Sequence, residues 1–485
     1  MFVSMINQFD VRALDRARIS RDARFDGKFF IAVKTTGIYC RPICPSRTSK
    51  SRNVSYYPTA AAAAEAGFRP CLRCRPEAAP GTPAWMGTSA VVRKALRLID
   101  EGILDTASVD ELASKLGLGS RHLRRLFLQH VGASPISFAQ TRRLQFAKRL
   151  LDETNLPITQ IALASGFGSL RRFNTAFLET YGRAPRDLRK HINEADEADD
   201  VVILKLAFRP PYDWEQVRDF LLVHHIPGVE QVNEQGYSRT LRTDGGFSIV
   251  NVKPLLNEDT LELRVTGAAP TSLFQISSAA RRVFDTSADP ALTTFALRTD
   301  PLLGPCVKRR PGLRIPGQWD AFECAVEAAL RDEGQDACQT LMAQIADRFG
   351  EKISKHGSAL TSLFPTPAAI ADGNFAGLSI SRSKVDALRR LARDVVDGKV
   401  DFSASSECVI ESITKVLSNR SMAEYIALRA LGEPDAFPSN DLVLRMIVSN
   451  TDRPLSAHQL EVRSEAWRPW RGYAALHLWC AAPAS

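Results

Sequence analysis

Several features that mark other classes of protein are missing from this sequence of 485 residues. It has no uninterrupted apolar stretch long enough to cross a membrane, and its start, MFVSMINQFDVRALDRARIS, lacks the pattern of a signal peptide. It also has no low-complexity run and no solenoid repeat. With 45% apolar and 24% charged residues, the composition is that of a globular protein. We therefore expect a cytoplasmic protein whose thiols stay reduced.

Negative charge is scarce in the first two-fifths of the chain. Residues 1–192 carry 31 Lys+Arg against 15 Asp+Glu, a balance of +16, whereas residues 193–485 carry 32 against 39, a balance of −7. A compact module with such a basic excess is typical of nucleic-acid binding, because neutralising phosphates releases their counterions. We expect the first part of the chain to bind DNA, and the protein to be associated with the nucleoid.

Three short segments without hydrophobic periodicity divide the chain, at residues 77–87, 193–200 and 309–320. Short β-like runs and one helix precede the first segment, and amphipathic helices fill the stretch up to the second. Strands then mix with helices, and the last part of the chain is helical. At this length three or four domains are expected. The sequence predicts a multidomain α+β protein with domains at residues 1–80, 85–192, 201–310 and 311–485.

Four of the nine cysteines form two close pairs, Cys40-x3-Cys44 and Cys71-x2-Cys74, separated by 26 residues. In a small module with reduced thiols, this spacing predicts a tetrahedral zinc site. A purely structural zinc site, which folds a module with little core, accounts for the spacing by itself. A thiolate among four is also electron-rich, so a nucleophilic role stays open. The other five cysteines, Cys306, Cys324, Cys338, Cys408 and Cys480, are expected to be buried apolar side chains.

The sequence flanking these cysteines identifies a protein family more specifically than their spacing does. RDARFDGKFFIAVKTTGIYCRPICPSR and EAGFRPCLRCRPE closely resemble the N-terminal domain of Ada-type methyl-phosphotriester methyltransferases, over about residues 8–78. The resemblance implies that Cys40, Cys44, Cys71 and Cys74 hold Zn²⁺, and that Cys40 irreversibly accepts a methyl group from a DNA methylphosphotriester. A zinc-based redox sensor is an alternative that needs only the four cysteines, but it does not explain why the flanking sequence resembles the Ada family.

Methylation of one sulfur would change the electrostatics of such a site. Four thiolates on one zinc ion sum to two net negative charges, and conversion of one thiolate to a thioether leaves one. The weaker repulsion strengthens DNA binding without any new contact. The basic setting expected to favour DNA comprises Arg41, Arg47, Arg69, Arg73 and Arg75.

Residues 106–181 contain one helix-turn-helix pattern twice. In TASVDELASKLGLGSRHLRRLFLQHVG, Ser108 and Glu111 have capping-box spacing, and a turn at Gly117 precedes a second helix. LPITQIALASGFGSLRRFNTAFLETYG repeats the plan with a turn at Gly166. Together, over about residues 89–190, they resemble the AraC-type DNA-binding domain, which is all-α. The resemblance implies an activator that works with RNA polymerase and places the second helix of each unit in a major groove.

The candidate DNA-contacting residues lie on these two second helices. A solvated basic helix face is the alternative explanation for part of them. They are Arg121, His122, Arg124 and Arg125 on the first, and Ser169, Arg171, Arg172 and Asn174 on the second. The core of the two units is expected to contain Leu123, Leu126, Phe127, Phe173 and Phe177.

From about residue 201 to the end, the chain resembles the 3-methyladenine DNA glycosylase II (AlkA) family. The resemblance rests on RRPGLRIPGQWDAFECAV, AEYIALRALGEPDAFPSNDLVL and WRPWRGYAALHLW. It implies an N-terminal α/β domain and an all-α helix-hairpin-helix core that flips a damaged base onto aromatic side chains, where one aspartate assists its excision. Asp441 matches that aspartate, and Tyr425 and Trp479 match the aromatic base pocket.

Two departures from that family fall where DNA would be held. In ITKVLSNRSMAEY, Leu417 and Asn419 replace the hairpin glycines, and Ser421 replaces a pocket tryptophan. Asparagine tolerates a left-handed conformation whereas leucine does not, so a phosphate site made of backbone amides is not expected to survive intact.

The second departure is ALRDEGQDACQTL, in which Asp332, Glu333 and Asp336 put negative charge where the DNA backbone would pass. Two interpretations remain for the C-terminal part: a slow or narrow glycosylase to which the basic modules deliver DNA, or an inactive glycosylase fold carried by an alkylation-sensing regulator. The chain lacks the Pro-Cys-His-Arg motif of O6-methylguanine methyltransferases, so that activity is not expected.

Overall fold

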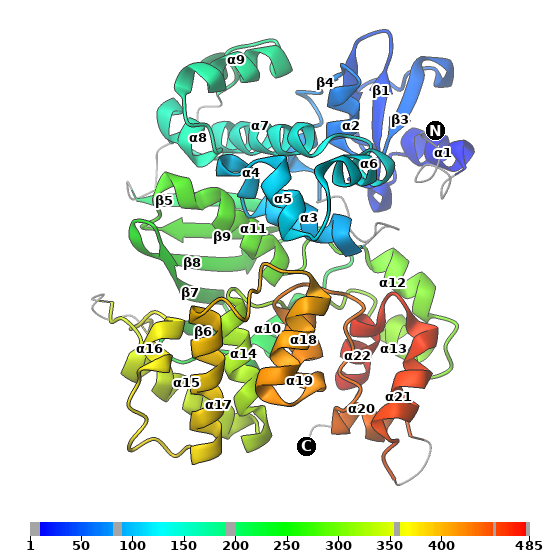
Figure 1. Cartoon of the computed structure of the whole chain (residues 1–485). Helices are drawn as coiled ribbons and strands as arrows, with labels where there is room; N and C mark the ends of the chain where they lie inside the picture. The colour runs from blue at the N-terminus through cyan, green and yellow to red at the C-terminus, as the bar shows by residue number, and fades with distance from the viewer. Residues whose placement is uncertain (1–9, 81–89, 190–199, 354–358, 450–452, 482–485) are drawn as a thin grey trace. The chain divides into compact units, whose positions relative to one another are not determined.

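The computed structural model describes residues 10–80, 90–189, 200–353, 359–449 and 453–481 (Figure 1). It consists of two compact units. The N-terminal unit comprises residues 1–209, 243–246 and 255–279, and the C-terminal unit comprises 210–242, 247–254 and 280–485. Helices and sheets alternate along the chain as the sequence predicts for a multidomain α+β protein, whereas the four domain boundaries stay predictions. No described helix is both long and apolar enough to cross a membrane.

The first module of the N-terminal unit is built on a small sheet. Its order is β3-β1-β2-β4, formed by Val54–Tyr57, Phe30–Val33, Ile38–Cys40 and Arg69–Pro70. Strand β1 is antiparallel to β2 and β3, whereas β2 and β4 are parallel. Because side chains alternate along a strand, Ile31 packs with helix α1 (Val11–Ser20) and Phe30 packs with helix α2 (Ala60–Glu65). The two apolar clusters that result are both small.

Seven helices follow in the same unit. They are α3 (Ala90–Asp100), α4 (Ile103–Thr106), α5 (Val109–Lys115), α6 (Ser120–His130), α7 (Pro135–Glu153), α8 (Ile158–Ala164) and α9 (Leu170–Tyr181). The predicted capping box is present, since Ser108 and Glu111 exchange side-chain-to-backbone hydrogen bonds at the start of α5. Gly117 and Gly166 both have positive φ, 68° and 75°, where each helix-turn-helix unit turns. The helix-turn-helix pattern that occurs twice in the sequence therefore forms two helix-turn-helix units in the structure.

The second sheet has five strands in the order β5-β9-β8-β7-β6. They are Val201–Ala207, Thr260–Thr266, Gly246–Pro254, Gly236–Thr243 and Glu230–Asn233. Strands β5 and β9 pair antiparallel along their full length, from Val201 opposite Thr266 to Ala207 opposite Thr260. Four helices belong to this part of the chain: α10 (Trp214–His224), α11 (Leu273–Val283), α12 (Pro290–Leu297) and α13 (Leu303–Arg309).

Helix α14 (Ala321–Leu330) packs against three of the remaining helices, α15, α17 and α19, and its residues from Phe322 onward are all buried. These remaining helices are α15 (Gln335–Phe349), α16 (Pro367–Ala371), α17 (Arg382–Val396), α18 (Ser406–Leu417), α19 (Arg420–Arg429), α20 (Leu442–Ile447), α21 (Ala457–Ser464) and α22 (Arg471–Trp479) (Figure 1). A short 3-10 turn, Arg331–Glu333, follows α14. The buried helix carries two acidic residues, Glu323 and Glu327, so their charges must be compensated inside the unit.

The turn between α18 and α19 differs from the expectation based on Leu417 and Asn419. The left-handed residue is Ser418, at φ 52° and ψ 27°. Leu417 remains in helix α18, and Asn419 is extended at φ −145°. The side chain of Asn419 accepts a hydrogen bond from the backbone N–H of Met422 at 3.2 Å, so it caps α19. That amide is thus satisfied within the chain.

This turn can be tested with two glycine substitutions. Ser418→Gly is expected to stabilise the C-terminal unit by about 0.5–1 kcal/mol, because glycine adopts the left-handed conformation without a Cβ clash. Leu417→Gly is expected to destabilise it by about 1 kcal/mol, because that position is helical. The urea midpoint of tryptophan emission measures both effects in this unit, which contains Trp214, Trp319, Trp467, Trp470 and Trp479. Stabilisation by Leu417→Gly instead would place the turn one residue earlier.

Candidate functional sites

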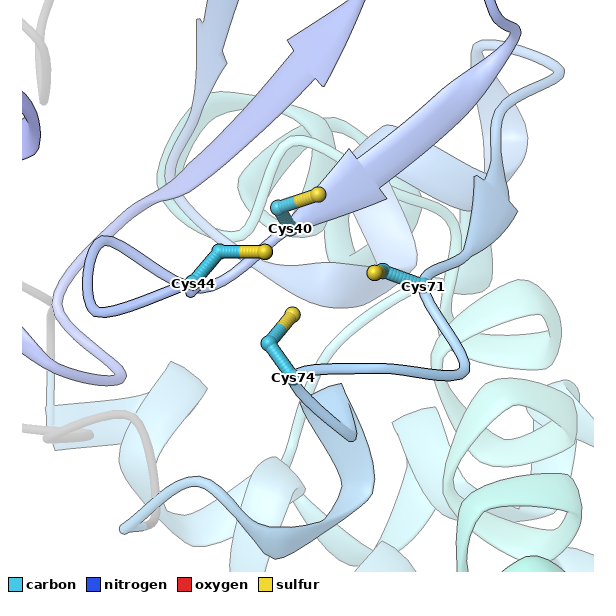
Figure 2. A group of neighbouring side chains, drawn as sticks. All are labelled: Cys40, Cys44, Cys71 and Cys74. Atoms are coloured by element: carbon cyan, nitrogen blue, oxygen red, sulfur yellow. The ribbon is translucent and has the colours of Figure 1, made fainter. Parts of the chain in front are cut away.

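The four predicted zinc cysteines converge on one point (Figure 2). Cys40 ends strand β2, Cys44 lies in the turn that follows, and Cys71 and Cys74 follow strand β4. The β2–β4 ladder fixes their approach, since the N–H of Cys71 donates to the carbonyl of Tyr39 at 2.9 Å. All four Sγ atoms lie within 4.8 Å of one another. Cys71 and Cys74 are buried, whereas Cys40 and Cys44 are partly exposed.

This arrangement fits Zn²⁺. A tetrahedral zinc with Zn–S bonds of about 2.3 Å requires sulfurs about 3.8 Å apart, which is within the observed span. Contacts with the three neighbouring sulfurs, and burial, raise the pKa of the Cys40 thiol. Four thiolates at this separation therefore need a cation to compensate their charge. The five other cysteines are free thiols, and the expectation that all are buried is wrong for Cys408 and Cys480, which are exposed.

Basic residues near the cysteines divide into paired and unpaired ones. The Arg41 guanidinium pairs with Asp26, with Nε and Oδ1 2.8 Å apart, and the Arg41 backbone N–H donates to Cys74 Sγ at 3.3 Å. Arg75 lies 2.8 Å from Asp152 on helix α7. Arg47, Arg69 and Arg73, in contrast, are exposed and make no ion pair with any described residue. Of the five arginines expected around the cysteines, these three are therefore positioned to meet an external phosphate.

Arg75 belongs to a buried ionic cluster within the N-terminal unit. Lys148 Nζ on helix α7 lies 2.6 Å from Asp152 Oδ2 and 3.9 Å from Glu77 Oε1. Glu77 is three residues beyond Cys74 and only 7% exposed. Burial raises the pKa of Glu77, and the charges of Lys148 and Arg75 oppose that rise. The segment that follows Cys74 is therefore held by ion pairs to helix α7, which joins the two helix-turn-helix units.

The candidate DNA-contacting side chains lie on matching faces of α6 and α9. Seven of the eight are exposed: Arg121, His122, Arg124 and Arg125 on α6, and Arg171, Arg172 and Asn174 on α9. None of the five arginines among them forms an ion pair with a described residue. Ser169 differs, because its hydroxyl accepts from the Arg172 N–H at 3.5 Å and caps α9. The expected core residues Leu123, Phe127, Phe173 and Phe177 are fully buried, and Leu126 is partly buried.

The structure brings Asp441 and Trp479 together. Asp441 is the N-cap of α20, and its Oδ1 accepts hydrogen bonds from the Leu444 N–H at 2.9 Å and from Trp479 Nε1 at 3.3 Å. Asp441 and Trp479 are both partly exposed. Tyr425 is buried on α19, and its hydroxyl accepts a hydrogen bond from Arg429. The carboxylate thus stays accessible while one of its oxygens is oriented.

Two residues beside Tyr425 were missed by sequence reasoning. Glu327 accepts from Gln318 Nε2 at 3.0 Å and lies 2.8 Å from His224 Nδ1. Burial by itself would raise the pKa of Glu327, but the hydrogen bond and charge of His224, with two nearby arginines, lower it to about 2. The second residue, Arg331, places its Cζ 4.0 Å from the centroid of the Tyr425 ring. The sequence did contain a signal for them: Glu327 lies inside the apolar run FECAVEAAL, and Arg331 follows that run directly.

The acidic segment after α14 is partly neutralised. Asp332 pairs with Lys384 at 3.1 Å, and the same Lys384 Nζ donates to the carbonyl of Ala329 at 2.7 Å. Glu333 and Asp336 are exposed. The negative charge expected to oppose DNA at this segment is therefore reduced but still present on the surface.

Comparisons with known proteins match three segments of this chain. Family models match residues 13–77 (metal binding domain of Ada), 112–191 (helix-turn-helix domain) and 203–320 (AlkA N-terminal domain). The chain is 37% identical over 473 residues, 96% of this chain and 95% of the relative, to the probable bifunctional transcriptional activator/DNA repair enzyme AlkA of Mycobacterium tuberculosis. Together, the Ada match and the four-sulfur cluster identify the metal as zinc.

The C-terminal part has relatives of its own. The chain is 28% identical over 283 residues, 56% of this chain and 95% of the relative, to DNA-3-methyladenine glycosylase 2 of Escherichia coli. Among solved structures, it is similar to the 3-methyladenine DNA-glycosylase of Archaeoglobus fulgidus, with a TM-score of 0.49 and 20% identity over 56% of this chain and 96% of that one.

The metal centre is tested by its stoichiometry. Purified protein is expected to hold one zinc per chain, and Cys71→Ser is expected to lose it, because three thiolates leave the tetrahedral site incomplete. Cys408→Ser is the matched control, because it changes an exposed cysteine of the other unit. This variant is expected to keep the metal. Elemental analysis after dialysis gives the result. A full zinc content in the Cys71 variant would place the metal elsewhere.

Proposed function

Since the chain belongs to the family of bifunctional transcriptional activator/DNA repair AlkA proteins, we propose that it senses and repairs alkylation damage in DNA. In this proposal Cys40 accepts a methyl group, the doubled helix-turn-helix activates transcription, and the C-terminal unit excises damaged bases. The observation that carries the proposal is the convergence of Cys40, Cys44, Cys71 and Cys74 in a chain that also contains a DNA-binding module.

Cys40 is the proposed methyl acceptor. Its sulfur attacks the methyl carbon of a methylphosphotriester, an S–C bond forms, and the C–O bond breaks with its electron pair left on the phosphate oxygen. The four cysteines would hold zinc, and the bound ion would keep their sulfurs as thiolates at neutral pH. The partial exposure of Cys40 supports this choice over the buried Cys71 and Cys74. Because the thioether persists, each chain reacts once.

DNA recognition and activation are assigned to the N-terminal unit. The exposed basic faces of α6 and α9 support contact with successive major grooves of duplex DNA. Loss of one negative charge at the cysteines would lower repulsion between the module and the backbone, close to Arg47, Arg69 and Arg73. RNA polymerase is the proposed partner of the activated protein.

Base excision is assigned to Asp441. An oriented carboxylate that stays accessible suits either stabilisation of a developing oxocarbenium ion or activation of water. Its hydrogen bond from Trp479 and the neutralisation of Asp332 by Lys384 favour an active enzyme. The second candidate, a regulator with an inactive glycosylase fold, is favoured by the exposed Glu333 and Asp336 and by the Met422 amide being capped within the chain.

Methyl transfer is tested by mass analysis of the protein after incubation with methylated duplex DNA. We expect a single added methyl group on the peptide that contains Cys40, and we expect the methylated protein to bind promoter DNA more tightly, by a margin that shrinks as salt rises. Cys408→Ser is expected to be methylated as the wild type is. A methyl group found on Cys44, Cys71 or Cys74 would overturn the assignment.

Glycosylase activity is tested by release of free 3-methyladenine, with Asp441→Asn as the key variant. Asparagine is as good an N-cap as aspartate, so the variant is expected to keep its fold while release falls at least a hundredfold. Asp320→Asn makes the same substitution at the exposed N-cap of α14 and is expected to leave the rate unchanged. No release by the wild type, with methyl transfer intact, would support the inactive fold.

A further inference from the structure

Part of the glycosylase-like sheet belongs to the same compact unit as the four cysteines. Strands β5 and β9 lie in the N-terminal unit, although residues 203–320 match the AlkA N-terminal domain. Strand β5 meets helix α7, where Arg149 Nη2 donates to the carbonyl of Lys205 at 2.7 Å. Phe146 of α7 and Phe274 of α11 form an edge-to-face pair with their ring centroids 5.0 Å apart. The N-terminal modules are therefore packed against the first strand of the glycosylase-like part.

Arg209 brings this contact to the cysteine module. It lies two residues beyond the end of β5 and is 1% exposed. Its Nε donates to the carbonyl of Asp26 at 3.0 Å, and its Nη2 donates to the carbonyl of Pro80 at 3.5 Å. Gly27 leaves space for it, because its φ is 72° and a Cβ there would lie 2.8 Å from Arg209 Nη2. A guanidinium buried this deeply needs such acceptors, so the contact is specific.

Asp26 carries the contact on to the cysteines. It is 4% exposed, and its carboxylate holds the Arg41 guanidinium, with Nε and Oδ1 2.8 Å apart. Arg41 directly follows Cys40, and its Nη1 donates to the carbonyl of Cys74 at 3.2 Å. The backbone N–H of Arg41 donates to Cys74 Sγ at 3.3 Å. Arg41 thus joins the two cysteine loops, and Asp26 orients it.

We propose that Arg209, a residue of the glycosylase-like part, is a positioning residue of the methyl-acceptor centre. The inference rests on the proposed methyl transfer to Cys40. Arg209 fixes the backbone of Asp26, whose carboxylate fixes Arg41. The N–H of Arg41 then stays on the Cys74 sulfur. Without Arg209, the Asp26 carbonyl would lose this donor in the interior, and its turn would shift toward water.

The reaction at Cys40 depends on this arrangement in two ways. Arg41 is the next residue in the chain, so its displacement misdirects the attacking sulfur, and an error of about 1 Å can cost about a hundredfold in rate. A sulfur that accepts an N–H also has less electron density to give, so Cys74 competes poorly as a nucleophile. The centre therefore depends on a side chain outside the residues that match the metal binding domain of Ada.

The test measures single-turnover methyl transfer from methylated duplex DNA to the full-length, zinc-loaded protein, with the rate expressed per bound zinc. Arg209→Leu is expected to slow transfer at saturating DNA by about tenfold or more, because Cys40 is misplaced. The DNA concentration at half-maximal rate is expected to change by less than about twofold, because Arg209 is buried and cannot meet DNA. Arg209→Lys keeps the charge and a donor group, so we expect it to recover part of the rate.

A second readout follows the position of the methyl group by peptide mass analysis. Methyl iodide needs no DNA recognition: a thiolate forms an S–C bond to its carbon, and iodide leaves with the electron pair of the C–I bond. We expect the wild type to be methylated on Cys40, and Arg209→Leu to carry part of the label on Cys74. Arg264→Leu, at a partly exposed arginine of β9, is the matched control and is expected to behave as the wild type does in both measurements.

The variants also distinguish a positioning role from a merely structural one. If Arg209→Leu binds less zinc or melts earlier, yet keeps the wild-type rate per zinc and the methyl group on Cys40, the proposal is wrong. Asp26→Asn tests the route. A double variant no slower than the slower single variant supports action through Asp26, whereas rate losses that multiply exclude it. Should Arg209→Leu not fold, Arg209→Lys is judged by the same rate and label position, and wild-type values for both overturn the inference.

Failure of this inference can be told apart from failure of the function on which it rests. If methyl transfer to Cys40 occurs but neither rate nor label position changes in the Arg209 variants, the function stands and the inference fails. If the wild type takes no methyl group from DNA, the methyl-transfer proposal fails, and the label from methyl iodide decides. A shift to Cys74 in Arg209→Leu then supports the contact, and an unchanged label position overturns it.

Discussion

Four sulfur atoms held within 4.8 Å of one another are the constraint on which the N-terminal module depends. Its two apolar clusters are small, and the sheet contains strands of only two to four residues. A core of that size contributes little stability, so metal binding and folding are coupled. In the proposed function, the same concentration of negative charge makes the module respond to methylation. Structural support and chemical sensing thus come from one set of four side chains.

The cysteine loop is connected to the helix-turn-helix units by ion pairs within the N-terminal unit. The loop that ends in Cys74 continues into Arg75 and Glu77, which meet Asp152 and Lys148 of helix α7. A buried cluster of this kind tolerates little displacement, because any separated charge would lose its partner in a medium of low dielectric. Helix α7 also joins the two helix-turn-helix units. The cysteine loop and the recognition helices are therefore held in a defined relation.

In the C-terminal unit, buried acidic side chains are paired with side chains from other segments of the chain. Helix α14 is buried along nearly its whole length, yet it carries Glu323 and Glu327, and each is compensated by side chains from distant segments. Arg331, just beyond the helix, turns back onto Tyr425. The segment that departs from the glycosylase family is thus not simply degraded sequence, because it places a charged group on the ring proposed to hold the base.

Spacing and motifs along the chain were enough to predict the four-cysteine cluster, the doubled helix-turn-helix and the glycosylase resemblance of the C-terminal part. The Ser108 capping box and the turns at Gly117 and Gly166 are local in the same sense. The folded structure was needed to show that Arg41 and Arg75 pair internally, that Ser418 is left-handed, and that Arg331 lies on Tyr425. These outcomes depend on which partner a side chain finds across the fold, and long flexible arginines reach partners that no periodicity encodes.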